Sequence, residues 1–329
     1  MRIGIIGAGA IGGWLGVRLA GAGHDISVLA RGATLAALTG GDWRLEANGQ
    51  VHLAKVRARE SAVDLGVQDL LIIALKAPAL LHVAPLLSPM IGPETQVLPA
   101  MNGVPWWFLL GGGGDLAPTS LTSIDPGGVI AQSIPFRQVV GAVVHASVSA
   151  PAPATIKHKA GNRLILGRPV GGTDGLGPIA AVFESAGLDL ELAQNIRREI
   201  WYKLWGNMTM NPISAFTGAT CDRLLDDPLV ADFVLRVMAE AQAIGNRIGC
   251  PIVERGEDRN GITRQLGAFK TSMLQDAEAG RPMEIDVLLS APRQIAEQLG
   301  IQTPNLDALL GLTRLFAGSN GSYGQPIAG

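Results

Sequence analysis

The sequence predicts an α/β domain with a parallel, doubly wound sheet, followed by an all-helical domain. The chain opens on a short apolar strand that leads through a glycine-rich turn into an amphipathic helix. Further apolar strands follow as far as about residue 167, and from about Asn195 the hydrophobic pattern has the helical period almost throughout. We therefore expect domains at 1–194 and 195–329, as suits a chain of 329 residues.

The turn after the first strand has the spacing of a dinucleotide-binding loop. Gly7 permits the tight turn, Gly9 lets a pyrophosphate approach the backbone, and Gly12 lets the helix pack on the strand. An ordinary strand-to-helix turn is the alternative, but the place of the motif favours a Rossmann-type domain that holds the pyrophosphate at the helix amino terminus. The predicted loop comprises Gly7, Ala8, Gly9, Ala10, Ile11 and Gly12.

The end of the second strand indicates which dinucleotide is bound. A site for NAD usually has Asp or Glu there, to accept a hydrogen bond from the ribose 2′-hydroxyl. This sequence has Arg31 instead. A guanidinium suits a 2′-phosphate, so Arg31 favours NADPH/NADP+ as cofactor, although it could also be an ordinary surface arginine.

Two later strands also end in polar residues. The strand "DLLIIALK" ends at Lys76, and "TQVLPAMN" ends at Asn102. Ligands bind beyond the carboxyl ends of the strands in such sheets, so both side chains are expected to face the cofactor, with loop capping as the alternative. Short strands at 138–148, 154–158 and 162–167, the last two joined by a turn at 160–162, are expected to extend this sheet before a helix near 174–187.

The segment "WYKLWGNMTMN" at 201–211 has an unusual helical pattern. Its aromatic and aliphatic residues cover an arc of about 140° at 100° per residue, and a polar stripe runs into that arc. The stripe consists of Lys203, Asn207 and Asn211. A polar side chain on a buried face costs roughly 1–3 kcal/mol unless it is hydrogen-bonded. Nearby loop carbonyls could satisfy these groups, but three in register indicate a bound polar ligand.

Composition limits the remaining function classes. The net charge of −2 gives no broad basic field for nucleic acid, and charges and prolines interrupt the most apolar run, which argues against a membrane span. The two cysteines and five histidines lack the spacing of a disulfide or metal site. We expect a reduced, cytoplasmic, metal-free protein, monomeric or homodimeric, with a small-molecule partner.

The helical half contains two more polar candidates. Ser272 lies near a helix end, and Glu284 follows a Gly-Arg-Pro break and opens the next helix. Acids stabilise the first turn of a helix, so Glu284 could be only a surface acid. The glycine-rich tail from Ala317 is expected to be a frayed end.

Read together, these motifs resemble the ketopantoate reductase (2-dehydropantoate 2-reductase) family from end to end. The matching segments are "GAGAIGG", "LKA", "MNGV", "NIRREIWYKLWGNMTMNPISA", "KTSMLQD" and "GRPMEID". The resemblance implies an amino-terminal Rossmann domain, a helical carboxyl-terminal domain, and NADPH-dependent reduction of a 2-oxo acid, foremost 2-dehydropantoate to pantoate in pantothenate biosynthesis.

The resemblance also implies a role for each polar candidate. Lys203 would be the general acid and Glu284 would support it. Asn207, Asn211 and Ser272 would hold the carboxylate and hydroxyl of the substrate, while Asn102 and Lys76 would lie near the nicotinamide and its ribose.

Some residues depart from the family pattern. Met283 stands where a threonine is usual, "IDVLLSAP" lacks a common Asn-Gly, and Trp106 and Trp107 make the segment after Asn102 unusually aromatic. These tryptophans could pack a loop or reshape the substrate entrance. Two alternatives therefore stay open: the same chemistry on another 2-oxo or 2-hydroxy acid, and a catalytically silent NADPH sensor. A sensor would need no proton donor, so Lys203 argues against the second.

Overall fold

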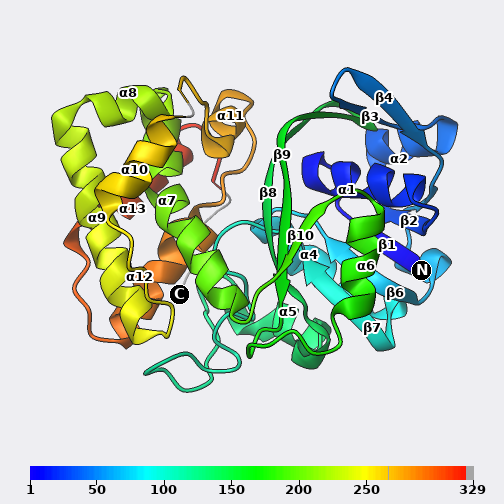
Figure 1. Cartoon of the computed structure of the whole chain (residues 1–329), viewed down its shortest axis with the longest axis horizontal. Helices are drawn as coiled ribbons and strands as arrows, with labels where there is room; N and C mark the ends of the chain where they lie inside the picture. Colours follow the sequence, from blue (N-terminus) through cyan, green and yellow to red (C-terminus); the bar gives the residue numbers. More distant parts are fainter. Residues whose placement is uncertain (266, 324–329) are drawn as a thin grey trace. The chain divides into compact units, whose positions relative to one another are not determined.

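The computed structural model describes residues 1–265 and 267–323, and the chain divides into two compact units (Figure 1). The first unit contains Met1–Met101 and Val129–Glu199. The second contains Asn102–Gly128 and Ile200–Gly329. The predicted limit at 194/195 lies close to the boundary between Glu199 and Ile200, whereas no sequence pattern indicated that residues 102–128 group with the helical half. It stays a prediction that residues 1–194 bind the cofactor and residues 195–329 bind the substrate.

The first unit is built on a five-stranded parallel sheet, as predicted. Its strand order is β5-β2-β1-β6-β7, with every pair parallel. The strands are β1 (Arg2–Ile6), β2 (Asp25–Leu29), β5 (Arg57–Arg59), β6 (Gln68–Ile73) and β7 (Ile91–Pro99). The apolar runs of β1 and β6 are almost fully buried, as is usual when both faces of a parallel sheet are covered.

Helix α1 (Ala10–Gly21) packs against this sheet and also against a second one. Two helix glycines permit the second contact. A Cβ atom at Gly13 would lie 2.4 Å from the side chain of Ile156, and one at Gly16 would lie 2.4 Å from Trp43. The other helical segments of this unit are α2 (Gly32–Gly40), α3 (Ala62–Leu65), α4 (Ala77–Val83), η1 (Ala84–Met90), α5 (Val129–Ser133), η3 (Phe136–Gln138) and α6 (Gly177–Ser185).

The strands expected to extend the first sheet instead form this second sheet. Its order is β10-β9-β3-β4, and β8 pairs with β9. The strands are β3 (Trp43–Ala47), β4 (Gln50–Ala54), β8 (Gly141–Ala152), β9 (Thr155–Gly167) and β10 (Asp189–Leu192). The predicted turn at 160–162 is also wrong, because β9 runs through it. Gly161 has φ +78°, and a Cβ atom there would lie 2.5 Å from the carbonyl oxygen of His145, opposite a shift in register. A glycine irregularity inside a strand has the same local sequence as a turn.

The second unit is helical, as predicted. Its long helix α7 (Ile196–Thr217) has its first turn in the first unit and continues through Pro212. Trp201 and Trp205 donate indole hydrogen bonds of 3.1 and 2.9 Å to the carbonyls of Ala241 and Met238 on α9. The other segments are η2 (Pro126–Gly128), α8 (Cys221–Asp226), α9 (Pro228–Arg247), α10 (Gly256–Arg264), α11 (Ser272–Glu278), the π-helical turn η4 (Asp286–Ser290), α12 (Ala291–Gln298) and α13 (Pro304–Ser319).

The carboxyl-terminal tail is ordered further than predicted. Helix α13 continues past Ala317 to Ser319, and Ser322 is only 1 % exposed. Its amide donates a 2.9 Å hydrogen bond to the carbonyl of Ala317, which folds the chain back at the helix end. Residues 324–329, the rest of the expected frayed end, lie outside the described residues.

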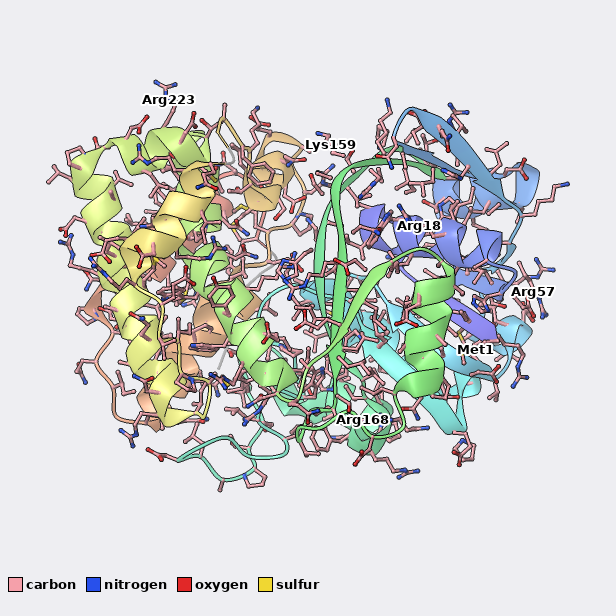
Figure 2. All side chains as sticks on the ribbon, in the orientation of Figure 1. Met1, Arg18, Arg57, Lys159, Arg168 and Arg223 are labelled. Carbon is pink, nitrogen blue, oxygen red and sulfur yellow. The ribbon has the colours of Figure 1, made fainter. Side chains whose placement is uncertain are left out.

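Most charged side chains lie on the outside of both units. Asp125 and Asp276 are the buried carboxylates among the described residues. Figure 2 shows Arg57 projecting from β5 and Arg223 from α8. Within residues 1–265 and 267–323, no helix is both long and apolar enough to cross a lipid bilayer.

Candidate active site

The glycine-rich loop between β1 and α1 has the geometry of a phosphate-binding turn. Gly7 has φ +98°, and a Cβ atom at Gly12 would lie 2.0 Å from the carbonyl oxygen of Gly7. In contrast, a Cβ atom at Gly9 would meet nothing within 4 Å, and Gly9 caps α1 without a side-chain hydrogen bond. Gly7 and Gly12 therefore shape the loop, while Gly9 leaves the helix amino terminus open to a pyrophosphate. Ala8, Ala10 and Ile11 complete the loop.

Alanine substitutions separate these two roles. In Gly12→Ala the new methyl group collides with backbone, so we expect a loss of about 1–3 kcal/mol in unfolding free energy together with weaker NADPH binding. In Gly9→Ala we expect unchanged stability and at least about tenfold weaker NADPH binding, because the methyl group occupies only the open side of the loop. Thermal denaturation and cofactor titration measure both quantities. Wild-type affinity in Gly9→Ala would contradict the proposed approach of the pyrophosphate.

Basic residues lie at or just after the carboxyl ends of three strands of the first sheet. Arg31 is exposed and precedes α2 in an extended conformation, two residues after β2 ends. Lys76 is partly buried and occupies the amino-terminal cap position of α4. The sequence pattern did not indicate Arg59, the last residue of β5, which pairs in register with Leu29 of β2. The strand "RAR" is too short to show the apolar run that marks a parallel strand.

The second unit brings Lys203 and Asn102 into direct contact. The Nζ atom of Lys203 donates a 2.8 Å hydrogen bond to Oδ1 of Asn102, which lies on the segment after β7. Asn207 is one turn further along α7 and partly buried, and Asn211 is only 7 % exposed. The polar stripe predicted on α7 therefore exists. Of its three residues, Lys203 bonds Asn102, which lies 101 positions earlier in the sequence.

The electrostatic surroundings of Lys203 suit proton donation. Burial lowers its pKa to about 8, and the nearby carboxylate of Glu284 opposes that fall. An ammonium with its ordinary pKa near 10.4 donates reluctantly at neutral pH, whereas a general acid works best when its pKa lies near the working pH. The charge of Glu284 therefore acts on the pKa of Lys203. An acid that only stabilised a helix end at the surface would have no such effect.

A π-helical turn holds the Asn102 segment in place. In η4 the carbonyl of Asp286 accepts the amide of Ala291, five residues later. The next carbonyl, that of Val287, accepts a 2.8 Å hydrogen bond from the amide of Val104. Gly103 makes this approach possible, because a Cβ atom there would lie 2.5 Å from the carbonyl oxygen of Val287. The turn begins two residues after Glu284, so the bond that holds the Asn102 segment lies close to Glu284 in the sequence.

Ser272 lies on α11, away from the hydrogen-bonded pair of Lys203 and Asn102 in the sequence. It is exposed at the first position of α11, whose amino terminus is capped by Thr271 through a 3.1 Å bond from the amide of Leu274. The structure gives no direct bond between Ser272 and Lys203, Asn102 or Glu284. Its role toward a substrate stays a prediction.

The aromatic segment after Asn102 is packed inside the protein. Trp106 and Trp107 are 3 % and 1 % exposed. The Trp107 ring lies 6.4 Å from that of Phe108, which lies 6.1 Å from that of Trp201 on α7. These contacts support the packing role that the sequence left open. Met283 is also buried, at 2 % exposure.

Charge neutralisation at Glu284 gives a test of the link to Lys203. A general acid must be protonated, so activity should fall as pH rises through about 8. Glu284→Gln removes the charge that raises the pKa of Lys203, and we expect the alkaline limb of the kcat profile to move to lower pH. The pH dependence of kcat under saturating substrate measures this shift. An unchanged limb would separate Glu284 from the proton donor.

Comparison with known proteins identifies the family. The family model described as "Ketopantoate reductase PanE/ApbA" matches residues 3–171, and its "C terminal" counterpart matches residues 195–317. The 2-dehydropantoate 2-reductase of Mesorhizobium japonicum is 43 % identical over 325 residues, which cover 98 % of this chain and 100 % of that protein.

Solved structures agree with this assignment. A protein from Ralstonia solanacearum MolK2, described as a ketopantoate reductase, has a TM-score of 0.94 and 56 % identity over 98 % of this chain and 99 % of that one. The 2-dehydropantoate 2-reductase of Geobacter metallireducens GS-15 has a TM-score of 0.83 and 25 % identity over 96 % and 99 % of the two chains. The predicted family, fold and enzyme class are confirmed, and this chain is an oxidoreductase that belongs to the ketopantoate reductase family.

Proposed function

We propose that this protein reduces 2-dehydropantoate to pantoate with NADPH. The observation that carries the proposal is the 2.8 Å bond between Lys203 Nζ and Asn102 Oδ1, which orients a buried ammonium whose pKa lies near 8. An ammonium in this state can protonate a ketone oxygen at neutral pH. The activity agrees with the names of the relatives described above.

The glycine loop and the basic residues of the first unit fit NADPH. Gly9 leaves the amino terminus of α1 open for the pyrophosphate, and Arg31 stands where NAD-binding proteins have an acid. Its guanidinium can form charge-assisted bonds with a 2′-phosphate. When bound, NADPH supplies the hydride that reduces the ketone carbon.

The residues of the second unit supply the rest of the chemistry. As charge develops on the ketone oxygen, Lys203 donates a proton from Nζ and neutralises it. Asn102 holds the ammonium in position, and Glu284 favours its charged form between turnovers. We assign Asn207, Asn211 and Ser272 to the carboxylate and hydroxyl of the substrate. Amides and hydroxyls provide such hydrogen bonds without adding charge.

The test is reduced-nicotinamide oxidation with 2-dehydropantoate, 2-oxoisovalerate and pyruvate, each with NADPH and with NADH. We expect rapid turnover of 2-dehydropantoate with NADPH. Turnover of another acid alone would keep the chemistry and change the substrate, an alternative that the buried Met283 in place of a usual threonine favours. NADPH binding without any turnover would favour the sensor. The cytoplasmic location and the monomeric or dimeric state stay predictions from the sequence.

A further inference from the structure

The segment that carries Glu284 lies outside any regular helix. Helix α11 ends at Glu278, and residues 281–284 have no helical or strand assignment before η4 begins at Asp286. Such a segment has no backbone ladder to hold it, so its position depends on individual bonds. The amide of Arg281 donates a 2.9 Å bond to the carbonyl of Asp276, which anchors the beginning of the segment.

The carboxyl-terminal tail supplies the anchors on either side of Glu284. On one side, the amide of Met283 donates a 3.0 Å hydrogen bond to the carbonyl of Ser322. On the other, the hydroxyl of Tyr323 donates a 3.0 Å bond to Oδ1 of Asp286. Two consecutive tail residues therefore hold the immediate neighbour of Glu284 and the residue two positions after it.

The tail is itself fixed by helix α13 and by a polar network. Ser322 is buried and bonded to Ala317, as described above. Oδ1 of Asp286 also accepts a 2.7 Å bond from the hydroxyl of Ser290, and that hydroxyl accepts a 3.0 Å bond from Arg314 on α13. Burial raises the pKa of Tyr323, so its phenol stays a neutral donor at physiological pH.

We propose that Ser322 and Tyr323 are positioning residues, which hold Glu284 at the distance from Lys203 that the reaction needs. This inference rests on the proposed function of Lys203 and Glu284. Without the two anchors, a chain that spans about 3.3 Å per residue can move its carboxylate by several ångströms. A charge interaction weakens with distance, so Lys203 would lose the influence that favours its protonated form.

Two truncations of the 329-residue chain test the proposal. Ending the chain after Gly321 removes both anchors, while ending it after Tyr323 keeps both and serves as the matched control. For the first we expect at least about a tenfold loss of kcat, an unchanged KM for NADPH, and an alkaline limb of the kcat profile moved to lower pH. For the second we expect wild-type values.

A substitution covers the case in which the shorter chain does not fold. Tyr323→Phe removes one hydroxyl and keeps the backbone bond of Ser322, so we expect a smaller shift of the limb in the same direction. Loss of melting temperature alone would not move this limb. A wild-type pH profile in Tyr323→Phe and in a folded chain ending at Gly321 would overturn the proposal.

Hydrogen exchange makes the result independent of the substrate. The amide of Met283 should exchange slowly in the wild type and in the chain ending at Tyr323, and faster in the chain ending at Gly321. Equal exchange in all three would overturn the anchoring. If the wild type reduced none of the 2-oxo acids, the proposed function would fail, while the exchange rates would still decide whether the tail holds this segment.

Discussion

Replacing Lys203 with alanine is expected to reduce kcat at least about a hundredfold while leaving NADPH affinity nearly intact. Loss of a general acid typically costs about 10²–10⁴ in rate. The methyl group of alanine also leaves Asn102 without the ammonium that now bonds its Oδ1 at 2.8 Å. Single-turnover reduction of 2-dehydropantoate measures the chemical step, and cofactor titration measures NADPH binding.

Two further variants show whether the proton or only the charge matters. Lys203→Arg retains a positive charge, but a guanidinium holds its proton far more strongly than an ammonium and is a poor donor, so we expect this variant to be nearly as slow as Lys203→Ala. Lys159→Ala removes an exposed lysine of the second sheet and should have wild-type kinetics. An active Lys203→Ala variant would show that Lys203 is not the proton donor. An active Lys203→Arg variant would show that only the positive charge of Lys203 is needed.

Local patterns predicted the parts of the fold that local sequence determines. The loop at Gly7 joins a strand and a helix that are adjacent in the sequence, so its spacing was sufficient. The period of α7 likewise identified its polar stripe. The second sheet was different, because β3 pairs in parallel with β9 more than a hundred residues later. Short apolar runs show that strands exist, but not which sheet they join.

The candidate site was also predictable only where its residues lie close together in the sequence. Lys203, Asn207 and Asn211 are spaced along one helix and could be found from periodicity. The bonds of Val104 to Val287 and of Met283 to Ser322 join backbone groups, which leave no trace in side-chain chemistry. The glycine-rich tail even suggested disorder, since glycine and serine are common in loose ends. Backbone contacts between distant segments are therefore what the structure adds to this site.

Replacing Arg31 with aspartate is expected to shift cofactor preference from NADPH toward NADH. A hydrogen bond to a charged group contributes about 1.5–3 kcal/mol, which corresponds to roughly ten- to hundredfold in affinity. The new carboxylate would also repel a 2′-phosphate and could accept a bond from a 2′-hydroxyl. We expect the ratio of kcat/KM for NADPH to that for NADH to fall by about a hundredfold. The reversal should be incomplete, because Arg59 ends the neighbouring strand and keeps a positive charge at this edge.

The matched control makes the same charge change on the edge strand β5, two residues before its carboxyl end, where Arg57 pairs in register with Ser27 of β2. Arg57 begins β5, where it bonds the carbonyl of Asp64, and it is exposed like Arg31. Arg57→Asp should therefore leave the cofactor ratio unchanged, since ligands approach the carboxyl edge of the strands. Equal ratios in Arg31→Asp and the wild type would make Arg31 an ordinary surface residue. Equal falls in both variants would mean that net charge, and not a bond to the 2′-phosphate, selects NADPH.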